Sequence, residues 1–305
     1  ADMLPQIKAN NPATRQMVSD GLFLIICGLV KKVMVADYLS GNFVSRIFEN
    51  PSLYSGFENL MGAMGFAIQL YCDFSGYSDM AIGLALLMGY RFRDNFDAPF
   101  KSQSPTELWR RWHISLSSWL RDYIYIPLGG NRKGKRRQHI NLMATMTIGG
   151  LWHGATWMYV IWGAYNGALL IIHKWLHKRF PAHPRLKGTR PAIVFNITVT
   201  LALTVLGFMI FRATSLDNIG LMLRQIFTDF RPAVIPAFLG SYALITAIIV
   251  GAYVMHFLPR RATDGLRRRY GATPLVVQAL ILALILFAVI QSRQSELVPF
   301  VYLQY

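Results

Sequence analysis

The chain has 305 residues, of which 53% are hydrophobic and only 15% are charged, whereas about 25% of residues are charged in ordinary soluble domains. The apolar residues come in long blocks, which excludes a soluble core with alternating polar positions and predicts an integral membrane protein. The net charge of +16 comes from basic clusters beside those blocks, at 131–137, 173–180 and 259–269. Cytoplasmic loops of membrane proteins have this pattern, so we predict that the chain contacts membrane lipid and has no nucleic-acid partner.

The first two apolar blocks each contain charged residues. Residues 21–39 include Lys31 and Lys32, and each charge at the centre of a span would cost about 2.5–3.5 kcal/mol on insertion scales. We therefore predict a helix tilted near an interface, with both lysine side chains reaching toward water. Residues 59–90 have the polar stretch DFSGYSD in their middle, which predicts a broken helix or a hairpin.

Residues 91–141 form the most polar long stretch and are rich in aromatic side chains. Ser104, Pro105 and Glu107 have the spacing of a helix N-terminus. The helix that they predict runs to the PLGGN stretch. Four of its side chains share one face by their i, i+3, i+4 and i+7 spacing: Trp109, Trp112, His113 and Leu116.

The apolar stretch 142–172 has basic residues on both sides. As one helix it would be about 46 Å long, against a hydrocarbon core of about 30 Å. Both basic flanks should face the cytoplasm. We therefore predict a re-entrant or broken hairpin whose break lies near Gly149, Gly150 and Gly154, with His153 inside the membrane layer.

The remainder predicts conventional spans at about 191–211, 234–257 and 275–291. Between the first two lies an amphipathic segment, which suits a helix on the outer membrane surface or one docked to a partner. Its apolar face would consist of Leu216, Ile219, Leu223, Ile226 and Phe230.

His153 is a candidate functional residue because an ionisable side chain in a membrane layer needs a partner or a role. Two interpretations are open: a catalytic group, or a neutral imidazole that donates to a backbone carbonyl in a packed bundle. His113 supports the first, since two converging imidazoles allow one to act as a base while the other stabilises charge. His173 and His177 have metal-ligand spacing, but their basic neighbours would repel a cation, so we predict no metal site.

No G-x-S-x-G, H-E-x-x-H, P-loop or G-x-G-x-x-G motif occurs in the sequence. A histidine acting on a hydroxyl group of a substrate is therefore favoured over a serine nucleophile of the chain. Among the remaining polar residues we predict a supporting role for Asp73, Asp79 and Asp122, by pairing with arginines or capping broken helix ends. Tyr77 is expected to line a tunnel or to pack.

Three long stretches resemble one protein family: WRRWHISLSSWLRDYIYIPLGGNRKGK, YCDFSGYSDMAIGLALLMGYRFRDNFDAPF and GGLWHGATWMYVIWGAYNGALL. They are similar to the membrane-bound O-acyltransferase family, and in particular to its bacterial branch, the membrane subunits of alginate O-acetylation systems. Relatives acetylate cellulose or peptidoglycan, or load D-alanine onto teichoic acids. The resemblance covers most of residues 20–231.

The resemblance implies a single all-α transmembrane domain over residues 1–305, in which tilted, broken and re-entrant helices surround a central funnel or tunnel. The expected location is the bacterial inner membrane, crossed several times. Relatives carry further N-terminal helices, so we expect this chain to be the C-terminal portion of a longer one. His153 matches the catalytic histidine of the family. His113 stands where eukaryotic relatives often carry asparagine.

The resemblance also implies acetyl-CoA as a co-substrate that is not tightly bound, and a periplasmic polysaccharide acetyltransferase as partner. Trp112 and Trp152, beside the two histidines, would support the tunnel. Four cations are candidates for binding the donor phosphates, although they could equally be cytoplasmic anchors: Arg110, Arg111, Arg132 and Lys133. A transporter or scaffold of a polysaccharide export complex, without chemistry, is the alternative from another class, and the glycan is left open.

Overall fold

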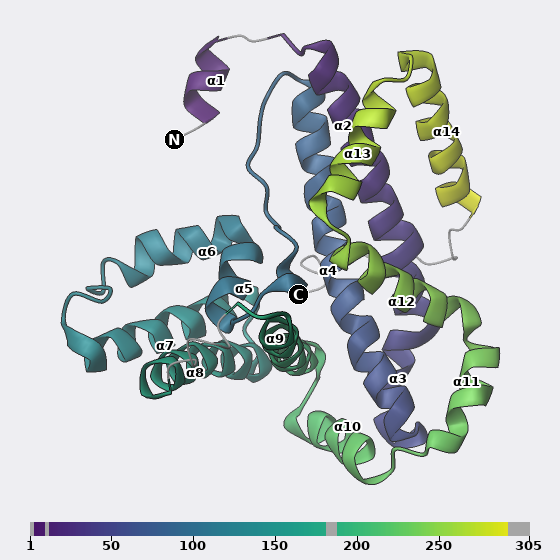
Figure 1. The fold of residues 1–305 in the computed structure, drawn as a ribbon. Helices are drawn as coiled ribbons and strands as arrows, with labels where there is room; N and C mark the ends of the chain where they lie inside the picture. The colour runs from purple at the N-terminus through teal and green to yellow at the C-terminus, as the bar shows by residue number, and fades with distance from the viewer. Residues whose placement is uncertain (1–2, 10–11, 181–187, 292–305) are drawn as a thin grey trace. The chain divides into compact units, whose positions relative to one another are not determined.

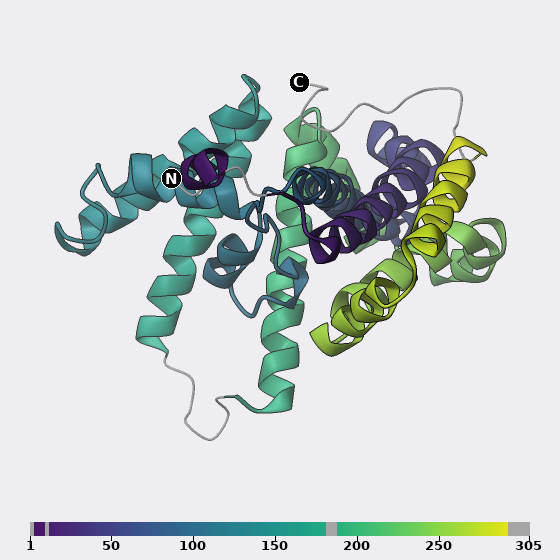
Figure 2. The ribbon, with the colours of Figure 1, turned by 90° about the horizontal axis from the view of Figure 1, so that it is seen from above.

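The computed structural model describes residues 3–9, 12–180 and 188–291, and this part of the chain is helical without strands (Figures 1 and 2). The α-helices are α1 (Met3–Ala9), α2 (Arg15–Leu29), α3 (Ser45–Glu49), α4 (Gly56–Leu87), α5 (Pro105–Arg111), α6 (Ile114–Leu120), α7 (Gly134–His153), α8 (Trp157–Arg179), α9 (Arg190–Arg212), α10 (Leu216–Thr228), α11 (Ile235–Ser241), α12 (Ala243–Phe257), α13 (Arg260–Gly271) and α14 (Leu275–Gln291). Short π-helical segments are η1 (Val30–Asp37), η2 (Ser40–Val44) and η5 (Arg121–Tyr125). Short 3-10 turns are η3 (Pro51–Leu53), η4 (Pro99–Lys101) and η6 (Pro232–Val234). The all-helical prediction is confirmed for these residues.

By length and composition, one of the described helices, α9, is suited to cross a membrane, and its bounds agree with the span predicted at 191–211. The total rises to as many as three if each of two bent helix pairs is counted as one span. The first pair, α11 and α12, replaces the single straight span predicted at 234–257. In the second pair, α14 matches the span predicted at 275–291, and the polar helix α13 turns away from it by 115°.

The chain divides into two compact units. Of the described residues, unit 1 comprises those within 3–44, 65–94 and 242–291, and unit 2 comprises those within 45–64 and 95–241. Helix α4 contributes its first turns to unit 2 and the rest to unit 1.

In unit 1, α2 lies against the later part of α4 with close backbone contact. A Cβ atom on Gly28 would lie 2.6 Å from the carbonyl oxygen of Gly76, so only glycine permits this approach. Helix α4 runs unbroken for 32 residues, and the break predicted within 59–90 is therefore wrong. The physical reason is that Asp73 and Asp79 in its polar middle form ion pairs with lysines of η1. These carboxylates are therefore stabilised while the helix remains intact.

In unit 2, α7 and α8 form an antiparallel hairpin and lie side by side (Figure 1). The hairpin turns at Gly154, which has a φ of 156°, close to the predicted break. Gly150 faces the backbone of Tyr159, and Gly163 faces the backbone of Met146, with no room for a larger side chain at either glycine. The broken hairpin predicted for 142–172 is confirmed in this respect.

The helix predicted to start at Ser104 begins there, because the Ser104 hydroxyl accepts a hydrogen bond from the Glu107 amide at 3.2 Å. The helix ends at Arg111, so the prediction that it continues to PLGGN is wrong. Residues 95–97 lie against the break, where the Asp97 amide donates to the Arg111 carbonyl at 2.9 Å and the Ile114 amide donates to the Asn95 carbonyl at 3.0 Å. These bonds replace helical ones and bring His113 to a φ of 45°.

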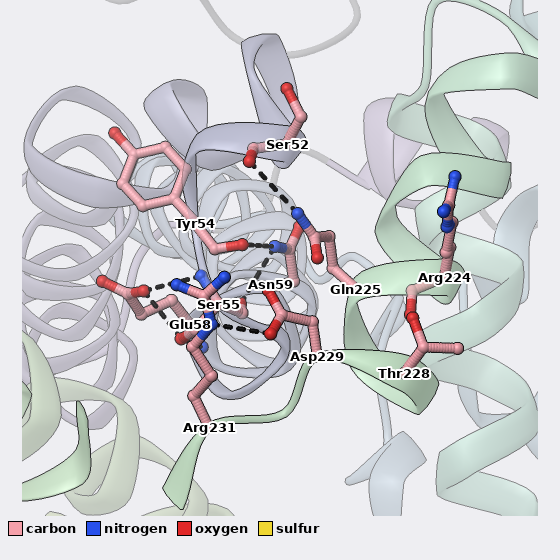
Figure 3. A network of polar contacts seen from close by, with 10 residues as sticks. All are labelled: Ser52, Tyr54, Ser55, Glu58, Asn59, Arg224, Gln225, Thr228, Asp229 and Arg231. Carbon is pink, nitrogen blue, oxygen red and sulfur yellow. Dashed lines mark hydrogen bonds and ion pairs between the residues drawn. The ribbon is translucent and has the colours of Figure 1, made fainter. Parts of the chain in front are cut away.

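The predicted amphipathic helix, α10, is docked on segment 48–56 of its own unit (Figure 3). The Gln225 side chain donates to the Ser52 carbonyl at 3.1 Å, and the Gly56 amide donates to the Asp229 carbonyl at 2.8 Å. Ile219 is buried as predicted, whereas Leu216 is exposed. The contact partner of α10 is therefore a segment of the same chain.

Candidate functional site

His153 ends α7 and is 8% exposed. Its imidazole is enclosed by aromatic rings from three helices. The ring centroids lie at 5.1 Å for Trp152, 5.0 Å for Trp162, 5.2 Å for Phe211 and 6.3 Å for Tyr159. The local sequence explains the arrangement, because Gly154 ends α7 directly after the histidine and turns the chain into α8. An apolar enclosure of this kind favours the neutral imidazole, which can accept a proton.

His113 lies in the break between α5 and α6 and is 7% exposed. Its ring centroid is 6.0 Å from that of Trp152, which itself contacts His153. The structure therefore brings both imidazoles to one indole. We call His113, Trp152 and His153 the histidine cluster. His113 is outside the candidate spans, and burial lowers its pKa to about 4, so this ring too is neutral near pH 7.

Asn95 and Ser115 hold the His113 ring, and the sequence interpretation missed both. Asn95 Oδ1 lies 3.3 Å from His113 Nδ1 and accepts hydrogen bonds from the Ser115 amide at 3.1 Å and the Ser115 hydroxyl at 2.9 Å. Asn95 precedes His113 by 18 residues, with η4 and α5 between them, so the two residues share no helix whose periodicity would relate them. The contact of Asn95 with His113 becomes visible only through the hydrogen bonds at the end of α5.

The two predicted supporting tryptophans differ in exposure. Trp112 is 5% exposed and packs on Phe96 and Phe208, with ring centroids 5.1 Å and 4.9 Å away. Trp152 is 53% exposed although it contacts both histidines. A small apolar hollow lies between α5, α8 and α9, and Trp162, which contacts His153, is part of its wall.

The four predicted phosphate-binding cations have different surroundings. Arg111 pairs with Glu107 at 2.8 Å and with Asp97 at 3.6 Å, and these carboxylates neutralise its charge. Arg110, Arg132 and Lys133 are exposed. Arg110 has a cationic neighbourhood: burial, then repulsion by Lys135 and Arg110, lowers the pKa of Lys174. Cations of α5, α7 and α8 therefore gather in one part of unit 2.

Asp73 and Asp79 lie in unit 1 and pair with lysines, which corrects the expected arginine partners. Lys32 Nζ lies 2.7 Å from Asp73 and 2.7 Å from Asp37, and Lys31 Nζ lies 2.6 Å from Asp79. We call these five residues the lysine–carboxylate cluster. Both lysines are bound by ion pairs within the unit, which stabilise their charges at that place, and the Lys31 side chain remains 31% exposed. That both side chains reach toward water stays a prediction.

Asp122 pairs with Arg121, whose hydrogen bond holds the pKa of this exposed carboxyl below its ordinary value. Tyr77 is 51% exposed and lies in unit 1. Within the described residues, no three side chains of His, Cys, Asp or Glu are arranged to hold a metal ion.

Comparison with known proteins gives consistent matches. Residues 2–214 match the membrane-bound O-acyltransferase family. The chain is 38% identical to the probable alginate O-acetylase AlgI of Pseudomonas putida, over 100% of this chain and 64% of that protein. It is 46% identical to the probable alginate O-acetylase AlgI of Pseudomonas syringae, over 72% of this chain and 40% of that protein.

A third relative, the peptidoglycan O-acetyltransferase of Helicobacter pylori, is 37% identical over 72% of this chain and 41% of that protein. The chain thus spans less than two thirds of the length of these relatives. The family match includes both histidines and all of α2 to α9. This chain is a membrane protein that belongs to the membrane-bound O-acyltransferase family.

Proposed function

We propose that this chain carries the catalytic histidines of an O-acetyltransferase in the bacterial inner membrane, which it crosses several times. The enzyme takes an acetyl group from acetyl-CoA on the cytoplasmic side and transfers it for the O-acetylation of an exported polysaccharide such as alginate. A periplasmic polysaccharide acetyltransferase completes the modification. The observation that carries this proposal is the histidine cluster, in which two buried imidazoles contact one indole.

The reaction needs one base and one site for developing negative charge. The oxygen of an acceptor hydroxyl attacks the thioester carbonyl while a histidine takes its proton. The new C–O bond forms, the C–S bond breaks, and the thiolate that leaves receives a proton from the imidazolium. The products are the acetyl ester and the free thiol, and the step needs no further reactant.

We assign the base to His153, because its aromatic enclosure favours a neutral ring. His113 assists by binding the substrate, by relaying the proton or by stabilising the oxyanion. Arg110, Arg132 and Lys133 attract the phosphates of acetyl-CoA, supported by Lys135 and Lys174 nearby. Arg111 is the weakest of the predicted phosphate ligands, since its charge is neutralised by two carboxylates.

The relatives support an exported glycan as final acceptor but do not agree on one. Two are named for alginate and one for peptidoglycan. We propose alginate because the alginate O-acetylases reach 46% identity. A cell that makes peptidoglycan O-acetyl groups but no alginate O-acetyl groups through this protein would redirect this part of the proposal.

The test measures transfer from labelled acetyl-CoA by the complete protein in membrane vesicles, with its periplasmic partner. His153→Ala should lower the rate by about 10²–10⁴, the usual contribution of a general base. His153→Gln retains more of the ring volume and separates loss of the base from loss of packing. His177→Ala, at an exposed position near the end of α8, is the matched control and should leave the rate unchanged.

Equal insertion and thermal stability of the variants must accompany the loss of rate. If His153→Ala and His153→Gln both transfer acetyl groups at the wild-type rate, the catalytic assignment is wrong. If the wild-type protein transfers no label yet remains essential for export of the polymer, a transporter or scaffold replaces the enzyme.

A further inference from the structure

Asn95 reaches the histidine cluster from outside the helices that form it. Its carbonyl oxygen accepts from the Ile114 amide at 3.0 Å, and its side chain contacts both His113 and Ser115. The residue therefore binds the backbone on one side of His113 and the imidazole itself. A non-glycine residue with a φ of 45° is held in an unfavourable conformation, which such bonds can stabilise.

The hydrogen bonds identify which atom of the Asn95 amide faces His113. A backbone amide can only donate, and the Ser115 amide lies 3.1 Å from that atom, so the atom is the oxygen, Oδ1. The same Oδ1 lies 3.3 Å from His113 Nδ1. An oxygen that carries no hydrogen is attracted to Nδ1 only when Nδ1 bears a proton.

The second neighbour of Nδ1 agrees with this assignment. The Ser115 hydroxyl lies 3.4 Å from Nδ1 and 2.9 Å from Asn95 Oδ1. Its single proton is directed to the shorter contact, so the hydroxyl faces Nδ1 as an acceptor. Both neighbours therefore require a proton on Nδ1. In a neutral imidazole the other nitrogen, Nε2, then carries no proton and has the in-plane lone pair.

We infer that Asn95 is a positioning residue that fixes His113 in the Nδ1–H tautomer and makes Nε2 the atom that accepts a proton. What Nε2 does in catalysis rests on the proposed function, whereas the tautomer does not. Asn95 acts through His113 and touches no reacting atom itself. A neutral amide orients the ring and stabilises the imidazolium much less than a carboxylate would.

The first experiment observes the tautomer directly. The complete protein, labelled with ¹⁵N-histidine and held in lipid nanodiscs, is studied by NMR, and the His113→Gln variant identifies the His113 signals by difference. We expect a protonated Nδ1 and an unprotonated Nε2 in the wild type, and a mixture of tautomers in Asn95→Ala. A wild-type His113 that carries its proton on Nε2 overturns the inference.

The second experiment uses the pH dependence of acetyl transfer. Asn95→Asp keeps an acceptor oxygen but adds a negative charge that stabilises the imidazolium, so a higher pH is needed to free the base. The acid limb of the kcat profile should move upward by about 1 pH unit or more. Asn95→Ala should lower kcat with little change in KM. The factor by which kcat falls should be smaller than that for loss of a whole base, which is about 10²–10⁴.

Ser118→Ala is the control: this serine lies on α6, its hydroxyl donates to the Ser115 carbonyl at 2.9 Å, and its loss should leave the pH profile unchanged. A wild-type acid limb in Asn95→Asp, together with wild-type kcat in Asn95→Ala, overturns the positioning role. If the wild type transfers no acetyl group, the proposed function fails, while the NMR result still decides the tautomer.

Discussion

The lysine–carboxylate cluster of unit 1 and the histidine cluster of unit 2 are both built from ionisable residues among apolar ones. In the first, each lysine ammonium meets carboxylates at 2.6–2.7 Å, contributed by η1 and α4. In the second, the imidazoles meet aromatic rings and neutral hydrogen-bonding groups.

The difference separates a structural role from a chemical one. Charges that neutralise each other between two elements hold those elements together, and removing one leaves the other buried and uncompensated. A neutral imidazole in an apolar enclosure keeps an electron pair that can take a proton. An ionisable residue among apolar ones needs a partner or a role, and the contacts of the two clusters show this difference.

The largest loss of stability is expected for Lys32→Met, which tests whether the lysine–carboxylate cluster is structural. Asp73, whose side chain is 2% exposed, would lose its ion pair with Lys32, and so would Asp37. We expect a loss of about 3–5 kcal/mol in the free energy of unfolding, with unchanged acetyl transfer per folded molecule. Thermal unfolding in nanodiscs and the transfer assay measure the two quantities.

Two controls accompany that variant. Lys32→Met combined with Asp73→Asn should recover part of the lost stability, because one buried charge is removed. Arg121→Met breaks the exposed pair with Asp122 and should have no measurable effect. If Lys32→Met folds as the wild type but loses transfer, the lysine–carboxylate cluster belongs to the chemistry and the comparison fails.

An intermediate effect is expected for Asn59→Ala, which tests a neutral polar side chain within unit 2. Asn59 is 0% exposed, and its side-chain amide donates to the carbonyls of Pro51, Tyr54 and Ser55 at 3.0 Å each. Figure 3 shows Asn59 beside Tyr54 and Ser55. Losing these bonds should cost about 1–3 kcal/mol, less than an orphaned charge. Chemical denaturation measures it. A cost above that of Lys32→Met would contradict the ranking of charged over neutral groups.

The smallest effect is expected for Ser104→Ala, which removes the N-terminal cap of α5. The loss should be about 1 kcal/mol, and Ser104→Asp should retain the cap and the stability. Because α5 leads into the break that holds His113, the transfer rate of Ser104→Ala should also be measured. A loss of rate in Ser104→Ala despite full folding would show that the start of α5 also positions the histidine.

Elements with a strong local signal agree with the structure. The cap at Ser104, the turn near Gly154, the span at 191–211 and the amphipathic helix α10 follow from residue types and spacing alone. The errors occur where a distant segment competes with the local pattern. The polar middle of α4 remains helical because lysines pair with it, and the helix after Ser104 ends early because residues 95–97 bind its backbone.

The sequence by itself determined that this is a helical membrane protein with two histidines in family motifs, because hydropathy, periodicity and motif spacing are local properties of the chain. The tertiary structure alone decided that both imidazoles meet Trp152, that Asn95 holds one of them, and that the two lysines are neutralised within their unit. Apart from the adjacent pair Trp152 and His153, these contacts join residues of different elements, and no local pattern specifies which of many polar groups will meet once the helices pack.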